Sequence, residues 1–201
     1  MATNSESKCR QCRREGMKLM LKGARCESAR CAFSRRDYAP GMHAWKRGKY
    51  SSYGMQLREK QKLKRFYGVR ERQFRRYFQM AERGKGNTGV ALLLLLERRL
   101  DNVLSRLGLA DSHAQARQLI THGHIEVNGK TVSTPSVLVK PGDVIAPRQR
   151  PSSSKLAAKI REGLQGRPVP SWLEVTPEPL QGRVLNLPNR EEVPVPVRED
   201  L

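Results

Sequence analysis

The four cysteines of this chain all lie between residues 9 and 31, with the spacing C-x2-C-x13-C-x4-C. They are Cys9, Cys12, Cys26 and Cys31. Two short-spaced pairs joined by a mid-length loop allow four thiolates to converge tetrahedrally on one Zn²⁺ ion. Lysine and arginine side chains surround them, and such cations favour the thiolate form that binds metals. The spacing therefore predicts a closed structural metal site without the open coordination position that catalysis needs.

Two alternatives to a zinc site remain open at this point. Two disulfides or four free thiols would leave no metal, and an iron–sulfur cluster is a minor alternative because four thiolates suit it as well. The N-terminal MATNSESK has no apolar segment typical of a secretory signal, and the longest apolar run, residues 90–96, is too short to span a bilayer. We therefore expect a cytoplasmic protein in a reducing compartment, with no membrane partner.

The positive charge of the chain is concentrated in its first half. The sequence has 39 lysines and arginines against 19 acidic residues, which gives a formal net charge of +20. Residues 1–85 carry 24 basic and 7 acidic residues, whereas residues 86–201 carry 15 and 12. Such a charge opposes compaction unless a polyanion neutralises it. No apolar membrane-binding face or lipidation site accompanies it, so nucleic acid is the favoured partner.

Three helices are predicted between residues 51 and 107. Ser51 or Ser52 can cap a helix that ends near Tyr67 and Gly68. An apolar stripe with the spacing i, i+3, i+4 and i+7 marks a second helix, and we expect its side chains in a core rather than stacked on bases: Phe74, Tyr77, Phe78 and Ala81. A leucine-rich stripe predicts a third helix over residues 90–107, which Gly108 would end.

Residues 97–146 predict two helices followed by a small, curled antiparallel sheet. Ser112 and Gln115 match a capping box, and Gly123 suits the left-handed end of the same helix. Asn128-Gly129 predicts a type I′ hairpin turn. After a short predicted helix beyond Ser154, the proline-rich tail is expected to be extended, with edge strands at best, because proline cannot donate to a strand ladder. The fold class is α+β.

The predicted helices and hairpin of residues 97–130 carry many polar and basic side chains outside their apolar stripes. The predicted face comprises Arg99, Asn102 and Arg106 on the first helix, Arg117, Gln118, Thr121 and His122 on the second, and His124 and Lys130 beside the hairpin, with His113 also expected to face RNA. From the residues alone, RNA binding and a solvated face are equally good interpretations.

The segment RRLDNVLSRLGLADSHAQARQLITHGHIEVNG resembles a small RNA-binding module that ribosomal protein S-four shares with some pseudouridine synthases and bacterial tyrosyl-tRNA synthetases. The motifs CRQCRREGMKLMLKGARC, RRDYAPGMH, YGMQLREKQKLKRFYGVRERQFRRYF and LLERRLDNVLSRLG also resemble, in this order, the bacterial small-subunit ribosomal protein S-four family. The resemblance covers residues 8–150 densely and the tail more loosely, and motifs in this order and number are highly specific.

The resemblance implies a structural constituent of the small ribosomal subunit. Members bind the 5′ domain of small-subunit rRNA early, nucleate assembly of the subunit body and affect translational accuracy. They lie near the mRNA entry channel beside the small-subunit proteins S-three and S-five, and some repress their own mRNA. Members with four matching cysteines carry a structural metal, here Zn²⁺ with an iron–sulfur cluster as the alternative. No small-molecule substrate is implied.

Four segments follow from this resemblance. Residues 1–45 form a metal-binding basic N-terminal arm, and residues 46–96 form a mainly helical rRNA-binding domain. Residues 97–160 form the S-four-type RNA-binding module, and residues 161–201 form a proline-rich extension that packs back on the helices. The further RNA-binding residues are expected to be Lys22, Arg25, Arg35, Arg36, Arg47, Lys49, Tyr53, Arg58, Lys60, Lys62, Arg72, Arg75, Arg76, Ser112 and Gln115.

An enzyme and a DNA-binding regulator are the competing functions. Arg99-Leu100-Asp101 resembles the triplet around the catalytic aspartate of pseudouridine synthases, but it falls inside a predicted helix, and about 55 proline-rich residues are too few for a catalytic domain. We expect Asp101 to support packing or to pair with an arginine. A zinc-dependent DNA regulator lacks support, because no recognition helix with a dimerisation segment is visible.

Overall fold

The chain forms two units, one of residues 1–80 with 195–201 and one of residues 81–194. The structure is a computed structural model and describes residues 7–44, 51–84, 86–148, 158, 168–193, 195, 197 and 198. We call the two parts unit 1 and unit 2. The expected division into four segments stays a prediction.

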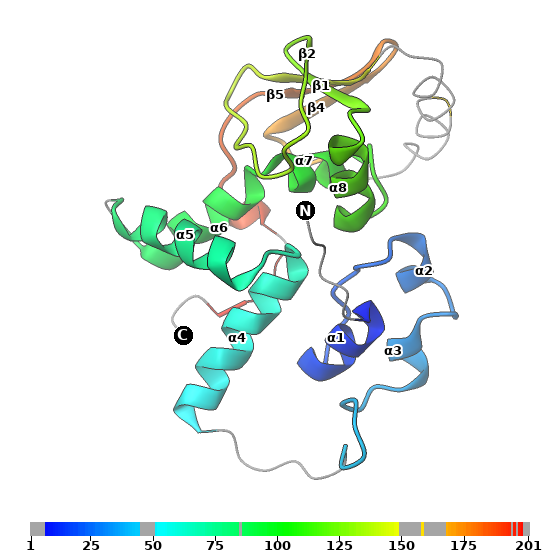
Figure 1. Ribbon diagram of the computed structural model, residues 1–201, viewed down its shortest axis with the longest axis vertical. Coiled ribbons are helices and arrows are strands. Elements are labelled where there is room, and N and C mark those ends of the chain that lie inside the picture. Colours follow the sequence, from blue (N-terminus) through cyan, green and yellow to red (C-terminus); the bar gives the residue numbers. More distant parts are fainter. Residues whose placement is uncertain are drawn as a thin grey trace. The chain divides into compact units, whose positions relative to one another are not determined.

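Unit 1 begins with three short helices, α1 (Lys8–Glu15), α2 (Ala24–Glu27) and α3 (Ala32–Arg35), drawn in blue in Figure 1. Cys12, Leu19 and Leu21 form a small buried cluster, against which Phe33 packs. The sequence analysis predicted no helix in this segment. Helices this short contain too few residues to show an apolar stripe, so their periodicity was not visible.

Two longer helices, α4 (Ser52–Phe66) and α5 (Glu71–Glu82), continue the chain. The Ser51 hydroxyl accepts a hydrogen bond from the Gly54 N–H at 3.1 Å, which confirms the predicted start of α4. On α5, the predicted apolar stripe is buried except at Phe78, which is 45% exposed. The prediction that Phe78 lies in the core is therefore wrong. The buried face of α5 consists of Phe74, Tyr77 and Ala81, and Phe78 lies at the border of this face.

Unit 2 contains α6 (Thr88–Glu97), α7 (Leu100–Arg106) and α8 (His113–Thr121). The prediction of one helix over residues 90–107 is wrong, because the chain becomes extended at Arg99 (φ −67°, ψ 135°). The N–H groups of Leu100 and Asp101 then donate to the carbonyls of Val137 and Pro135, at 2.8 and 3.2 Å. The break is thus stabilised by a segment far along the chain, which local periodicity does not reveal.

The strands of unit 2 are β1 (Ile125–Val127), β2 (Lys130–Thr131), β3 (Val144–Pro147), β4 (Leu173–Pro177) and β5 (Leu180–Val184), and the short 3-10 helix η1 (Arg190–Glu192) follows them. They form one antiparallel sheet in the order β2-β1-β3-β5-β4. Asn128 (φ 51°) and Gly129 (φ 75°) both adopt the left-handed conformation that the predicted type I′ turn requires.

The proline-rich tail contributes more to this sheet than its composition suggested. The expectation of edge strands at best is wrong for β5, which lies between β3 and β4. β5 itself contains no proline, so all its residues can donate to a ladder. Gly182 of β5 lies so close to α7 that an added Cβ would stand 2.5 Å from the Leu107 side chain. The helix predicted after Ser154 falls outside the described residues except for Ala158.

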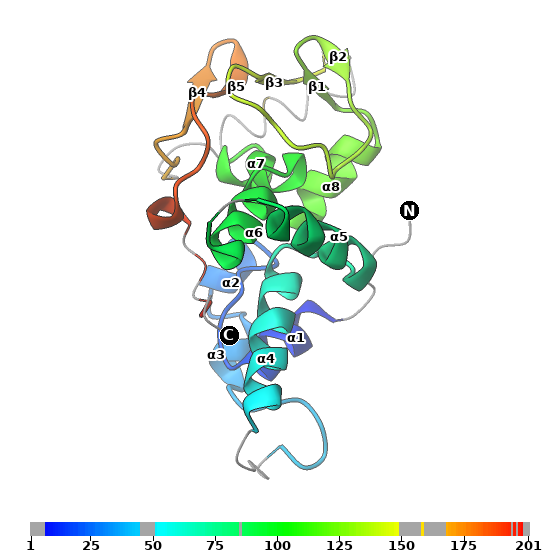
Figure 2. The ribbon, with the colours of Figure 1, turned by 90° about the vertical axis from the view of Figure 1, so that its left-hand side faces the viewer.

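Figure 2 shows α7 and α8 on one face of this sheet. The buried core between them includes the residues whose side chains point inward from helices and strands: Leu100, Leu104, Leu107, Ala116, Ile120, Ile125, Ile145, Leu173 and Val184. This packing fixes the exposed face of α8 and the hairpin. Among the described helices, none combines the length and apolarity needed to cross a bilayer.

Candidate nucleic-acid interface

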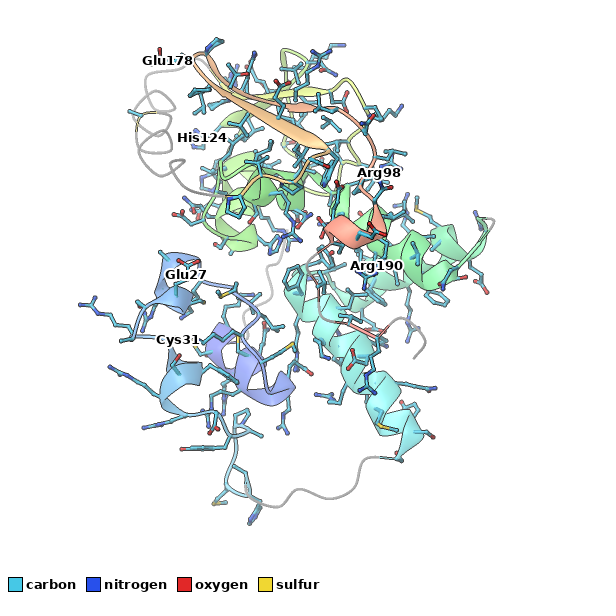
Figure 3. The ribbon with its side chains drawn as sticks, turned by 180° about the vertical axis from the view of Figure 1, so that it is seen from behind. Glu27, Cys31, Arg98, His124, Glu178 and Arg190 are labelled. Carbon is cyan, nitrogen blue, oxygen red and sulfur yellow. The ribbon has the colours of Figure 1, made fainter. Side chains whose placement is uncertain are left out.

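The four cysteines lie on the three short helices of unit 1 and next to them. Cys9 and Cys12 belong to α1, and Cys26 belongs to α2. Cys31, which is labelled in Figure 3, immediately precedes α3. All four carry free thiols, and three of them are buried. Among the described residues, no three histidine, cysteine or acidic side chains form a group that could hold a metal ion.

Backbone N–H groups nevertheless point at three of these sulfur atoms. The Lys22 N–H donates to Cys26 Sγ at 3.3 Å. Hydrogen bonds from the Ser34 and Phe33 backbone at the start of α3 hold the pKa of Cys31 below its ordinary value. Burial raises the pKa of Cys12, opposed by a hydrogen bond from Leu19 and increased by the charges of the other three cysteines. N–H groups aimed at sulfur are the outer partners that thiolate ligands have in metal sites, so the donor chemistry fits a cation.

Unit 1 displays arginines and lysines whose side chains form no ion pair with any described residue. The residues of this kind that the sequence singled out are Lys22, Arg25, Arg35, Arg36, Arg72 and Arg76, and all are exposed. On α5, Arg72, Arg76 and Gln79 follow the spacing i, i+4 and i+7, which places them on one face, away from the buried stripe. Unpaired cations on a rigid helix are suited to contact phosphates.

The basic residues of α4 differ, because acidic side chains pair with them. Arg58 lies 3.5 Å from Glu15, and Lys62 lies 2.6 Å from Glu59. Lys60 donates to Glu71 at 2.6 Å, and this contact, with help from Lys64, lowers the pKa of Glu71 to about 2. These cations are partly neutralised within the protein and have less charge to offer an RNA phosphate.

In unit 2, the Asp101 carboxylate is buried and accepts four hydrogen bonds. Arg99 donates two of them, at 3.0 and 2.7 Å, and both side chains are only 1% exposed. Arg117 donates a third at 2.7 Å and the Asn102 N–H a fourth at 3.0 Å. Asp101 therefore pairs with arginines, as expected, and has no accessible oxygen for catalysis.

A second buried carboxylate, Glu97, organises the neighbouring side chains. Arg106 donates to it through two nitrogens, at 3.0 and 2.6 Å. The Asn102 amide donates to its carboxylate at 2.6 Å and to its backbone carbonyl at 2.9 Å. The Asn102 carbonyl oxygen then lies 2.8 Å from His113 Nε2. We call the residues around Asp101 and Glu97 the carboxylate network: Glu97, Arg99, Asp101, Asn102, Arg106, His113 and Arg117.

His113 is uncharged within this network at neutral pH. Burial lowers its pKa to about 4, although the Asp101 and Glu97 carboxylates act in the opposite direction. Because the Asn102 amide nitrogen donates to Glu97, its carbonyl oxygen must accept from His113, which assigns the proton to Nε2. His113 therefore links α8 to α7, and RNA contact by this half-buried residue stays a prediction.

The outer face of α8 and the hairpin carries the remaining predicted residues of unit 2. Gln118, Thr121, His122 and Lys130 are exposed, and His124 is half-buried, with its ring centre 6.2 Å from that of His122. Ser112 caps α8 by accepting from the Gln115 N–H, and the Gln115 side chain accepts from the Asp111 N–H. Ser112 and Gln115 thus shape the helix start.

Two family models match the chain in sequence. "Ribosomal protein S4/S9 N-terminal domain" matches residues 3–97, and "S4 domain" matches residues 98–145. The small ribosomal subunit protein uS4 of Thermoanaerobacter sp. (strain X514) is 59% identical over 194 residues, which cover 96% of this chain and 93% of that relative. The uS4 proteins of Caldicellulosiruptor bescii (58% over 193 residues, 96% and 93%) and Acetivibrio thermocellus (54% over 201 residues, 100% and 97%) match similarly.

This chain belongs to the uS4 family. The matched S4 domain contains α7, α8, β1, β2 and the first two residues of β3, while β4 and β5 lie beyond both matched ranges. The carboxylate network therefore belongs mainly to the S4 domain, with Glu97 at its border, and the exposed arginines of unit 1 belong to the N-terminal domain of the uS4 chain.

Within this uS4-family chain, the predicted surface of Arg99, Asn102 and Arg106 is not formed. Arg99 and Asn102 are buried and cannot face RNA, and Arg106 is directed to Glu97. The break before α7 turns these side chains inward. Arg117 keeps 24% of its side chain exposed, Arg75 keeps 75% with a 3.4 Å contact to Glu71, and Tyr53 is 71% exposed. RNA contact by these three stays a prediction, and Arg47 and Lys49 lie outside the described residues.

Sequence reasoning also passed over exposed cations of this uS4-family chain. They are Arg10, Arg14, Lys18, Arg30, Arg70 and Arg183. Arg10 and Arg14 are one turn apart on α1, but their spacing was not used because no helix was predicted there. Arg183 lies on β5, a strand that was not expected to be central.

Proposed function

We propose that this protein is a structural constituent of the small ribosomal subunit and that unit 1 provides its main contacts to rRNA. Membership of the uS4 family supports this function. The observation that carries the residue assignment is the set of exposed arginines and lysines without acidic partners among the described residues of unit 1. Phosphate contacts supply a large share of the affinity of such complexes and fix orientation. In bacteria, the protein acts in the cytoplasm as part of the ribosome.

The 5′ domain of small-subunit rRNA is the proposed binding site. Early binding there would nucleate the body of the subunit, and a position near the mRNA entry channel, beside S-three and S-five, would link the protein to translational accuracy. The sequence motifs quoted above support this finer assignment. The exposed face of α8, with Gln118, His122 and nearby Lys130, provides a second surface for RNA.

The test compares binding of the full chain to a 5′-domain transcript and to a scrambled RNA of equal length, across a salt series. Counterion release weakens both complexes as salt increases. If binding is specific, the protein still binds the native transcript at salt concentrations at which it no longer binds the scrambled RNA. Equal affinities and equal slopes would contradict the proposed function.

We also propose that the four cysteines hold a structural metal ion, Zn²⁺ in preference to an iron–sulfur cluster. The cysteine spacing and the N–H groups directed at three sulfur atoms support this assignment. When bound, the metal would cross-link three short helices that have little core of their own. Metal analysis of the purified protein should find about one zinc per chain, and Cys9→Ser with Cys12→Ser should lose it and unfold α1. Absence of metal with unchanged circular dichroism would contradict the proposal.

An enzymatic role finds no support at the one position where the sequence suggested it. The two carboxylate oxygens of Asp101 are engaged by Arg99, Arg117 and the Asn102 N–H, and the side chain is 1% exposed. A tritium-release assay on uridine-labelled RNA should therefore show no turnover. Release above background would reopen the pseudouridine synthase interpretation.

A further inference from the structure

An exposed aromatic side chain, Tyr38, follows the basic pair Arg35 and Arg36 in unit 1. Tyr38 is 43% exposed and is outside the buried cluster of this unit. The guanidinium of Arg13 lies over its ring, with Cζ 4.8 Å from the ring centre. One face of the ring is therefore covered by a cation, while the residue keeps much of its surface open to solvent.

Arg13 is itself held in place by the backbone next to this ring. Its Nε donates to the Tyr38 carbonyl at 2.9 Å, and its Nη2 lies 3.5 Å from the Ala39 carbonyl. Both acceptors are neutral, so no carboxylate offsets the positive charge of Arg13, whereas the Asp101 carboxylate offsets that of the arginines paired with it. The clamp joins α1 to the segment after α3 and restricts the orientation of the Tyr38 ring.

A restricted, half-exposed ring among cations matches the chemistry that recognises single-stranded RNA. Unpaired bases stack on tyrosine rings, and nearby arginines contact the phosphates on either side. Arg35 and Arg36 are exposed and form no ion pair with a described residue. Holding the ring in advance removes part of the entropy loss on binding. A protein partner would instead use the apolar edge of the ring and would not need the flanking cations.

We propose that Tyr38 is a preformed stacking platform for one unpaired RNA base, with Arg13 as the positioning residue behind it. The inference rests on the proposed rRNA binding and adds the contact by which an unpaired nucleotide is held. It assigns the platform to unit 1, where Arg13 of α1 meets Tyr38 in the segment after α3.

The experiment measures affinity of the full chain for the 5′-domain transcript, together with the chemical reactivity of its unpaired nucleotides. Tyr38→Ala and Tyr38→Leu should each weaken binding about tenfold and should expose one unpaired nucleotide to the probe. Tyr38→Phe and Tyr38→Trp should retain the affinity, because they keep an aromatic face. Phe78→Ala is the matched control: Phe78 is 45% exposed and has no arginine over its ring in the described structure, so a loss of affinity of twofold or less is expected.

Arg13 is tested by a double-mutant cycle with Tyr38. Arg13→Ala alone should weaken binding about threefold, but it should add almost nothing to Tyr38→Ala, because the two residues act as one unit. Independent, additive losses would overturn the positioning role.

The outcomes separate the platform from the function on which it rests. Unchanged affinity and footprint in Tyr38→Ala, with native RNA still preferred over scrambled RNA, would overturn the platform and leave the proposed function intact. Full affinity in Tyr38→Leu would show an apolar contact rather than stacking and would also overturn it. Equal binding of native and scrambled RNA by the unsubstituted protein would overturn both.

Discussion

Arg72 and Arg76 of unit 1 and Arg99 and Arg106 of unit 2 have opposite environments. In unit 2, Arg99 and Arg106 donate to the buried carboxylates of Asp101 and Glu97. In unit 1, Arg72 and Arg76 lie on the open face of α5 with no acidic partner among the described residues. The comparison teaches that a basic residue in an RNA-binding chain is informative only together with the location of the nearest carboxylate.

This difference assigns separate tasks to similar side chains. A buried ion pair whose remaining hydrogen-bonding groups are satisfied fixes the relative orientation of the elements that carry it. The carboxylate network therefore orients α7 and α8, and through α8 the exposed surface of the S4 domain. Exposed, unpaired arginines contribute little to folding and remain available for phosphates.

The largest expected effect comes from removing the carboxylate of the network. Asp101→Ala leaves Arg99 buried without its partner, so the free energy of unfolding should fall by about 3–5 kcal/mol. Urea denaturation measures the loss. Asp37→Ala, at an exposed aspartate, is the control and should change stability by less than about 0.5 kcal/mol. If Asp101→Ala lowers the free energy of unfolding by less than about 1 kcal/mol, the proposed difference between the buried, paired arginines of unit 2 and the exposed arginines of unit 1 is contradicted.

A smaller effect is expected from the pH dependence of the network. The pKa of His113 is lowered by burial to about 4 from its usual 6.5, so the unfolded chain binds a proton between these values and the folded chain does not. Stability should be complete above pH 6.5 and should fall towards pH 4, by up to about 3 kcal/mol. His113→Gln keeps a donor for Asn102 without titrating, so the difference between the two proteins isolates this group. Parallel stability curves for both proteins would contradict the assignment.

The smallest effect is expected at the half-exposed ion pairs of unit 1. The pKa of Glu71 is lowered to about 2 from 4.5, chiefly by Lys60, so its contribution is present above pH 4.5 and is lost as the pH falls towards 2. Because these side chains are about one-third exposed, Glu71→Gln should lower stability by less than about 1 kcal/mol at pH 7. Thermal unfolding at pH 7 and pH 3 measures the change. If Glu71→Gln lowers the free energy of unfolding by more than about 2 kcal/mol, this pair stabilises the fold as strongly as a buried ion pair, which contradicts the account.

Local signals predicted the parts of the fold that local interactions determine. The Ser51 cap, the Asn128-Gly129 turn and the left-handed Gly123 all follow from the requirements of one turn or one helix end. The break before α7 was missed because the carbonyls of Pro135 and Val137 stabilise it from more than 30 residues away. The central position of β5 was missed because composition averages over the tail and hides a proline-free strand.

The type of site could be predicted from the sequence, but several of its individual residues could not. Charge distribution and family motifs indicated RNA binding, and spacing correctly placed Arg72 and Arg76 outside the apolar stripe of α5. Burial of Arg99 and Asn102 depends on where Asp101 and Glu97 point after folding, which no spacing rule provides. The arginine clamp on Tyr38 joins residues 25 positions apart and was likewise invisible.

The most direct test of the account is the salt dependence of binding to the 5′-domain transcript by Arg72→Ala with Arg76→Ala. The neutral Gln79→Ala on the same face of α5 is the control. If the exposed arginines of unit 1 contact phosphates, the slope of log affinity against log salt should fall by about two, with unchanged thermal unfolding. An unaltered slope and affinity would show that this face is merely solvated and would contradict the assignment of rRNA binding to unit 1.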